Sequence, residues 1–198
     1  MTTHNDVTEA HHAIQHGHVI IYPTDTLYAL GADPTNTTAL HTLFSLKHRT
    51  PDIPLPVAVH SLTAIDHIAT LTPTARRLAD RFLPGPLTLI LHKKPLLPDL
   101  LTAGQPTIAI RIPNDPTALQ LLHLTGPLTA TSANLHNQPT PATVPEILQQ
   151  LHASALHAID RGPRNQTAST IIDLTTTPPQ ILRHGTIPDH TILEALHG

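Results

Sequence analysis

Short apolar runs alternate along this chain with longer stretches in which apolar positions recur every three or four residues. Compact apolar runs are typical of strands buried on both faces, and the longer spacing is typical of amphipathic helices. The runs predict strands at 18–22, 57–59, 87–91, 107–111, 128–130, 170–174 and 180–183. The longer stretches predict helices between an Asp6 cap and Gly17, and at 37–46, 73–82, 117–124, 144–152 and 189–196.

Strands separated by helices indicate an α/β domain in which helices cover a sheet. No repeat, low-complexity tract or linker divides the 198 residues, so we expect one domain over 1–198. The apolar runs are too short to span a bilayer, and the first six residues lack the basic and apolar segments of a secretory signal. We therefore expect a cytoplasmic protein without a membrane segment.

Composition narrows the possible chemistry. The absence of Cys excludes disulfides, thiol nucleophiles and Cys-ligated zinc. A net charge of −3 leaves no broad basic surface for nucleic acid, and an aromatic content of 2% argues against base-stacking platforms. The 17 His residues include an i,i+4 pair near the amino terminus, but no neighbouring carboxylate completes a metal site, so we expect none. Walker A, Gly-x-Gly-x-x-Gly and Gly-x-Ser-x-Gly motifs are absent, so side-chain cations and hydroxyls would have to hold any nucleotide.

The scarce cations give the first candidate site. Lys47 and Arg49 follow a predicted helix, and positions two apart point the same way in an extended stretch. Two cations on one side, without an adjacent acid, would form a phosphate clamp. The alternative is a solvated helix end, where cations meet the helix dipole favourably. Spacing alone favours this alternative.

Two polar segments after predicted strands give further candidates. In Pro23–Gly31, Thr24 and Thr26 could face a ligand, or the segment could be a turn whose side chains bond their own backbone. Ser132 and Asn134 offer a hydroxyl and an amide to phosphate oxygens or to a metal-bound water. A turn or cap is the alternative for this pair, and in isolation it is favoured.

Two arginines end predicted strands. Arg111 precedes Pro113, and Arg183 precedes Gly185. An Arg at the rim of an α/β sheet is well placed to hold a carboxylate or phosphate. Surface ion pairing with Asp115 or Asp189 is the competing interpretation.

Seven motifs in this chain occur in the order in which they occur in one family. They are Tyr22–Asp33, Lys47–Arg49, Pro84–Thr88, Arg111–Pro113, Ser132–Asn134, Ser169–Leu174 and Leu182–Gly185. With these motifs, the chain resembles the YrdC-like, or TsaC-type, threonylcarbamoyl-AMP synthases over about residues 18–187. Each motif is weak alone, whereas seven in register are very specific.

The resemblance implies a twisted, mixed α/β sheet covered by helices, with a concave, positively lined cavity. It also implies that L-threonine, bicarbonate and ATP give threonylcarbamoyl-AMP and pyrophosphate, with Mg²⁺ as the divalent metal. A partner complex would then transfer the threonylcarbamoyl group to tRNA, and direct tRNA binding by this acidic chain is expected to be weak. The resemblance ends at about residue 187, about eleven residues before the end of the sequence, so we expect the single-domain form of the family.

The resemblance also assigns roles by position. The catalytic set that handles ATP phosphates is Lys47, Arg49, Ser132 and Asn134. Further ATP contacts are Thr107, Thr140 and Arg183. The threonine pocket is Thr26, Arg111 and Ser169, with the backbone of Ala130.

Three positions depart from the family pattern, and two functional alternatives stay open. Ala29 replaces the commoner Gly, Ala58 a frequent His and Ala168 a frequent Glu, and the last two concern the threonine pocket. One alternative is a non-catalytic RNA-binding protein of the YciO kind, but the intact Lys47–Arg49 and Ser132–Asn134 motifs argue against it. The other, a carbamoyl-transfer domain of the HypF kind, is normally embedded in a longer chain with zinc-finger-like and acylphosphatase segments, which are absent here.

Overall fold

The computed structural model describes residues 3–197, so Met1, Thr2 and Gly198, which the single-domain prediction included, lie outside it. The helices are α1 (Thr3–Gln15), α2 (Thr37–Leu46), α3 (Leu62–Ile68), α4 (Pro73–Phe82), α5 (Asp99–Thr102), α6 (Pro116–Thr125), α7 (Val144–Gln150) and α8 (Asp189–His197). The strands are β1 (Ile20–Tyr22), β2 (Ala29–Gly31), β3 (Val57–Ala58), β4 (Leu87–His92), β5 (Thr107–Arg111), β6 (Leu128–Thr129), β7 (Thr131–Ser132), β8 (His157–Ala158), β9 (Thr170–Asp173) and β10 (Gln180–Arg183). The α/β class is therefore confirmed.

The strands form two mixed sheets, so the expectation of one sheet is wrong. One sheet has the order β7-β2-β1-β8, and the other has the order β10-β9-β4-β5-β3-β6. Consecutive strands β6 and β7 belong to different sheets, since β6 pairs with β3 and β7 pairs with β2. Between them the backbone N–H of Ala130 donates to Pro56 O, which ends the predicted strand 128–130 one residue early. The chain thus passes from one sheet to the other at Ala130.

Most predicted elements are found close to their expected positions. The bounds of α2, α4, β5 and β10 agree with the prediction. The predicted cap at Asp6 is wrong, because α1 already begins at Thr3 and the Asp6 carboxylate pairs with Arg161 at 3.1 Å. Strands β2, β7 and β8 and helices α3 and α5 were not expected. The three strands and α5 have two to four residues each, too few for a hydrophobic period to develop. Helix α3 has seven residues and buries Ala64, Ile65 and Ile68 at helical spacing, a pattern that the prediction missed.

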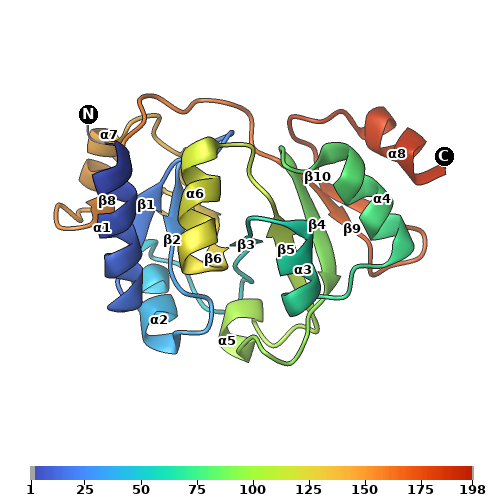
Figure 1. The fold of residues 1–198 in the computed structure, drawn as a ribbon, viewed down its shortest axis with the longest axis horizontal. Coiled ribbons are helices and arrows are strands. Elements are labelled where there is room, and N and C mark those ends of the chain that lie inside the picture. Colours follow the sequence, from blue (N-terminus) through green and yellow to red (C-terminus); the bar gives the residue numbers. More distant parts are fainter. Residues whose placement is uncertain (1–2, 198) are drawn as a thin grey trace.

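An aliphatic core fills the space between the sheets and their helices. The larger cluster of buried side chains takes Leu residues from α2, α4 and β4, and a second cluster joins α1, β1 and α6. In Figure 1, α1 lies beside α6 near one end of the molecule, whereas α4 and α8 lie together at the other end. Among residues 3–197, no helix is both long and apolar enough to cross a membrane.

Candidate functional site

A cavity of about 350 Å³ lies between the two sheets and receives residues from both. Its lining consists of Thr24, Thr26, Leu27, Tyr28, Ala29, Arg49, Pro54, Pro56, Thr88, Ile90, Ala109, Arg111, Ala130, Thr131, Ser132, Ala168, Ser169, Ile171 and Arg183. Three arginines, several hydroxyls and an aliphatic floor thus face one space. This volume and this mixture are typical of a small-molecule site.

The segment after β1 serves as a turn and as a wall of the cavity. The Thr24 hydroxyl accepts from the backbone N–H groups of Thr26 and Leu27 and donates to Leu27 O at 2.6 Å, so the turn interpretation holds for Thr24. The Thr26 hydroxyl contacts Thr24 Oγ1 at 3.1 Å and accepts from Arg111 Nη1 at 3.0 Å. The rigid turn therefore presents Thr26 to the same space as Arg111.

Arg111 lies at the end of β5, with its side chain 8% exposed. Its Nη2 donates to Asp25 Oδ1 at 2.5 Å and to Gly85 O at 3.3 Å. Burial lowers the pKa of Arg111, and the neighbouring Asp25 carboxylate opposes that shift. The competing interpretation placed Asp115 beside this arginine, but the ion pair is formed with Asp25 in the Thr24–Thr26 turn.

A second cluster joins strands β4 and β10 through Ser169, which directly precedes β9. Arg183 donates from Nε to Ser169 O and from Nη2 to Ser169 Oγ, both at 2.9 Å. The Ser169 hydroxyl also lies 2.8 Å from the hydroxyl of the buried Thr88. Burial, and then the positive charge of Arg111, lower the pKa of Arg183. The suggested partner Asp189 contacts His184 instead, at 2.8 Å.

Lys47 is the most buried of the predicted cations, with 2% of its surface exposed. It caps the carboxyl end of α2, and the following His48 has a positive φ of 48°, so this stretch is not extended. Lys47 Nζ donates to Ser132 O at 2.5 Å, to Asn134 O at 2.8 Å and to Asn134 Oδ1 at 3.1 Å. Burial, and then Arg49, lower its pKa to about 7. The solvated-helix-end interpretation is therefore wrong for Lys47.

Arg49 binds the backbone of residues 53 and 54 and reaches Thr131, which directly precedes Ser132. Its Nη2 donates to Pro54 O at 2.6 Å and to Ile53 O at 3.1 Å, and its Nη1 reaches Thr131 Oγ1 at 3.4 Å. Burial lowers the pKa of this guanidinium. Unlike Lys47, Arg49 lines the cavity.

The loop that Lys47 holds contains the Ser132 and Asn134 motif. Ser132 Oγ donates to Asn134 Oδ1 at 2.5 Å, and Asn134 Nδ2 donates to Leu135 O at 2.8 Å and Gln138 O at 2.5 Å. Asn134 therefore acts as a turn residue, as its alternative interpretation held, while Ser132 lines the cavity. The structure brings the two motifs together across 85 to 87 residues of sequence.

The cavity gathers most of the predicted site residues, and four lie outside its lining. Those inside are Thr26, Arg49, Arg111, Ala130, Ser132, Ser169 and Arg183, and those outside are Lys47, Thr107, Asn134 and Thr140. Of the departures from the family pattern, Ala29 and Ala168 line the cavity, whereas Ala58 is fully buried outside it. In residues 3–197, no three His or acidic side chains gather as they would around a metal ion. Thr88, which contacts Ser169, and Asp25, which pairs with Arg111, were not predicted as site residues, although both lie within recognised motifs.

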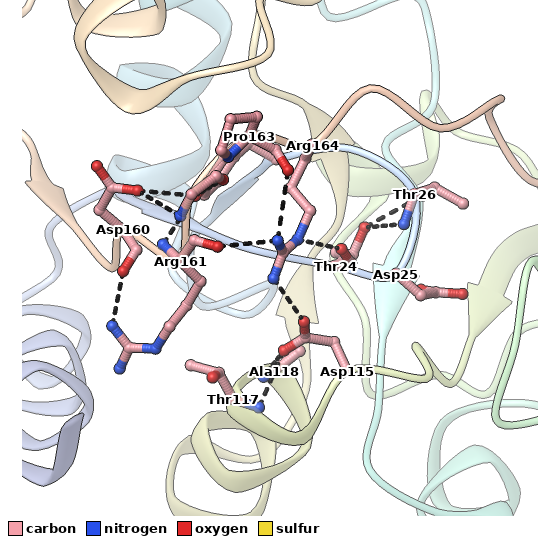
Figure 2. A network of polar contacts seen from close by, with 12 residues as sticks. Thr24, Asp25, Thr26, Asp115, Thr117, Ala118, Asp160, Arg161, Pro163 and Arg164 are labelled. Atoms are coloured by element: carbon pink, nitrogen blue, oxygen red, sulfur yellow. Dashed lines mark hydrogen bonds and ion pairs between the residues drawn. The ribbon is translucent and has the colours of Figure 1, made fainter.

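Arg164 stabilises the Thr24–Thr26 turn from outside the cavity. No motif in the sequence predicted this role. Figure 2 shows Arg164 between the Asp160–Pro163 loop, Thr24 and Asp115. Its guanidinium donates to Thr24 O at 3.1 Å, to Arg161 O at 2.9 Å and to Asp115 Oδ2 at 3.2 Å. The other oxygen of Asp115 caps α6 by accepting from two backbone N–H groups, each at 2.9 Å. One side chain thus ties the turn to the start of a helix.

Replacing Arg164 by Ala is expected to destabilise the protein. Asp115 is 5% exposed and would lose its cationic partner. Asp115 would keep its two hydrogen bonds to backbone N–H groups of α6. We therefore expect the free energy of unfolding to fall by about 2 kcal/mol, which is less than the usual cost of breaking a fully buried ion pair. Urea unfolding measures this value. Arg76→Ala is the control, because its ion pair with Asp80 is exposed and should contribute less than about 1 kcal/mol. Equal shifts in the two variants would contradict this stabilising role.

Comparison with known proteins adds a second line of observation. The Sua5/YciO/YrdC family model, described as "Telomere recombination", matches residues 12–185. A Pyrococcus abyssi protein named threonylcarbamoyl-AMP synthase is 37% identical over 178 residues, which are 88% of this chain and 52% of that protein. The Bacillus subtilis protein of the same name is 35% identical over 201 residues, covering all of this chain and 58% of the relative. The chain therefore spans about half the length of these two relatives.

A solved structure of P. abyssi Sua5 complexed with L-threonine has the same fold. It superposes with a TM-score of 0.90 at 35% identity, over 96% of this chain and 56% of that one. The likeness includes the strands and turns that surround the cavity, because it extends over nearly the whole chain.

Proposed function

Because the chain belongs to the Sua5/YciO/YrdC family, we propose that it is a threonylcarbamoyl-AMP synthase, a nucleotidyltransferase acting on L-threonine, bicarbonate and ATP. The observation that carries the proposal is the convergence of Arg49, Arg111 and Arg183 on one cavity with Ser132 and Ser169. Relatives that bear this name support the reaction, and the threonine complex of P. abyssi Sua5 supports the amino acid.

The amino-acid half of the proposed site lies around Arg111. A guanidinium is the side chain best suited to a carboxylate, because its N–H groups match the two oxygens. Thr26 lies 3.0 Å from this guanidinium and offers a hydroxyl to the threonine side chain. Ser169 and the backbone of Ala130 complete the proposed pocket, and both residues line the cavity.

The nucleotide half is proposed to extend toward Arg49, Ser132 and Arg183. The carbamate oxygen of threonine would attack the α-phosphorus in line, and pyrophosphate would leave. Such a transfer depends on positioning and on neutralising the phosphate charge, which the arginines would supply in a cationic cavity. Lys47 and Asn134 would act through the loop that carries Ser132. Thr107 and Thr140 do not line the cavity. Their proposed contact with ATP therefore rests on family position alone.

Mg²⁺ is proposed to enter with ATP. The lining residues include no Asp or Glu, and the neighbouring Asp25 carboxylate is paired with Arg111. Mg²⁺ is commonly bound through substrate phosphates and water. The residues described thus fit a metal carried by the triphosphate better than a resident one. The product is proposed to pass, in the cytoplasm, to a complex that modifies tRNA, and weak direct tRNA binding follows from the net charge of −3.

Pyrophosphate release tests the proposed function directly. The protein is incubated with ATP, Mg²⁺ and bicarbonate, with and without L-threonine. We expect pyrophosphate only when both bicarbonate and L-threonine are present, because the attacking oxygen belongs to their carbamate. D-threonine is the control for the amino-acid pocket. Release that does not depend on L-threonine would refute the assignment.

A further inference from the structure

The ion pair between Asp25 and Arg111 occupies the donors that a substrate carboxylate would need. Arg111 has five N–H bonds, and both edges that present two parallel N–H bonds include Nη2. One Nη2 hydrogen bond is made to Asp25 and the other to Gly85 O, while Nη1 donates to Thr26. Neither edge therefore has two free donors. A carboxylate can bind Arg111 through two parallel bonds only if Asp25 or Gly85 O gives way.

Asp25 is the partner that can give way. Gly85 O belongs to the backbone, and the Gly85 N–H is fixed by a 2.8 Å bond to Ile112 O. The Asp25 carboxylate, in contrast, belongs to a side chain that can rotate. This side chain is 13% exposed and lies in the turn between Thr24 and Thr26. A carboxylate that leaves Arg111 is replaced there by another carboxylate, so the guanidinium keeps a charged partner throughout.

The second oxygen of Asp25 lacks a donor in the structure. Asp25 Oδ2 is buried and without a hydrogen-bond partner, as is Arg111 Nε. A buried carboxylate oxygen without a donor is costly, so the pair gains by finding one. An α-amino acid carries an ammonium two bonds from its carboxylate carbon. A substrate carboxylate on Arg111 would bring that ammonium beside Asp25.

We propose that Asp25 is the residue that selects an α-amino acid zwitterion: the substrate carboxylate takes the place of Asp25 on Arg111, and the released Asp25 carboxylate binds the substrate ammonium. One ion pair within the protein becomes two between protein and ligand, with no charge left unpaired. A simple carboxylate would release Asp25 without giving it a partner. This inference deepens the proposed function and rests on it.

Binding measurements on Asp25→Asn test the inference. The probes are L-threonine and 3-hydroxybutanoate, which has the same carboxylate and hydroxyl but no amine. Ligand-observed NMR gives both dissociation constants. We expect the wild-type protein to prefer L-threonine by at least about tenfold, and the variant by less than about threefold, because a neutral amide binds both a guanidinium and an ammonium more weakly than a carboxylate does. If the folded variant still prefers L-threonine over 3-hydroxybutanoate as strongly as the wild-type protein does, the inference is overturned.

A measurement on the wild-type protein keeps the inference falsifiable if the variant does not fold. The ¹³C signal of the Asp25 carboxylate should shift when L-threonine is added, and ATP alone should leave it in place. An unmoved signal at saturating L-threonine would overturn the exchange at Asp25 while leaving the proposed function intact. If the wild-type protein does not bind L-threonine at all, the proposed function fails and the inference fails with it.

Discussion

Replacing Lys47 by Met should lower turnover by roughly 100-fold, although Lys47 lies outside the cavity lining. Met keeps the aliphatic length but removes the ammonium that holds Ser132 O, Asn134 O and Asn134 Oδ1. A displacement of about 1 Å in a loop that positions reacting groups can cost two orders of magnitude in rate. Steady-state pyrophosphate release at saturating substrates measures the effect.

The same variant should lose stability, which separates Lys47 from a surface cation. Acceptors buried without a donor cost about 1–3 kcal/mol, so we expect the free energy of unfolding to fall by about 2 kcal/mol. Arg76→Met is the matched control, because Arg76 is half exposed and its loss should leave both turnover and unfolding nearly unchanged. A Lys47→Met protein that behaves like this control would show that the loop holds its position unaided.

Arg111→Lys should raise the KM for L-threonine by roughly 30-fold. Lys keeps the charge and can still pair with Asp25, but it cannot present two parallel N–H bonds to a carboxylate. Losing a charge-assisted bond costs about 2 kcal/mol, which corresponds to a factor of roughly 30. Initial rates at varied L-threonine, with ATP held at saturation, give the value.

ATP provides the internal control for this variant. Arg111 belongs to the amino-acid half of the proposed site, so the KM for ATP should change by less than about threefold. If the KM rises more for ATP than for L-threonine, Arg111 belongs to the nucleotide half of the site. Arg111→Lys also keeps a cation beside Asp25, so a folding defect is less expected than for a neutral replacement.

Local signals predicted the fold well where they were strong. Helix α2 was found at its predicted bounds because Asn36 caps it, with its side chain accepting from Ala39 N at 3.0 Å, and because its apolar spacing persists over ten residues. Strands β7 and β8 have two residues each, too few for any periodicity. The division into two sheets depends on which strands pair, and pairing is decided by tertiary contacts.

The site was predicted as a set of residues rather than as an arrangement. Family motifs placed Arg111, Lys47 and Asn134 in the site, but they indicated neither the contact between Lys47 and Asn134 nor the role of Asp25 as partner of Arg111. Arg111 pairs with Asp25 across 86 residues, and Lys47 reaches Asn134 across 87, so spacing along the chain carries no sign of either contact. Arg164 belongs to none of the seven motifs. Its stabilising role depends on the position of α6 relative to the turn, which only the folded chain defines.

Since the cavity takes Ser132 from one sheet and Arg183 from the other, a ligand that contacts both residues recognises only the folded arrangement of the two sheets. Its binding free energy is then added to the unfolding free energy of both halves together. At a concentration 100 times the dissociation constant this amounts to about 2.7 kcal/mol. Substrate would thereby protect residues far from the cavity against heat and proteolysis, as a cooperative unit.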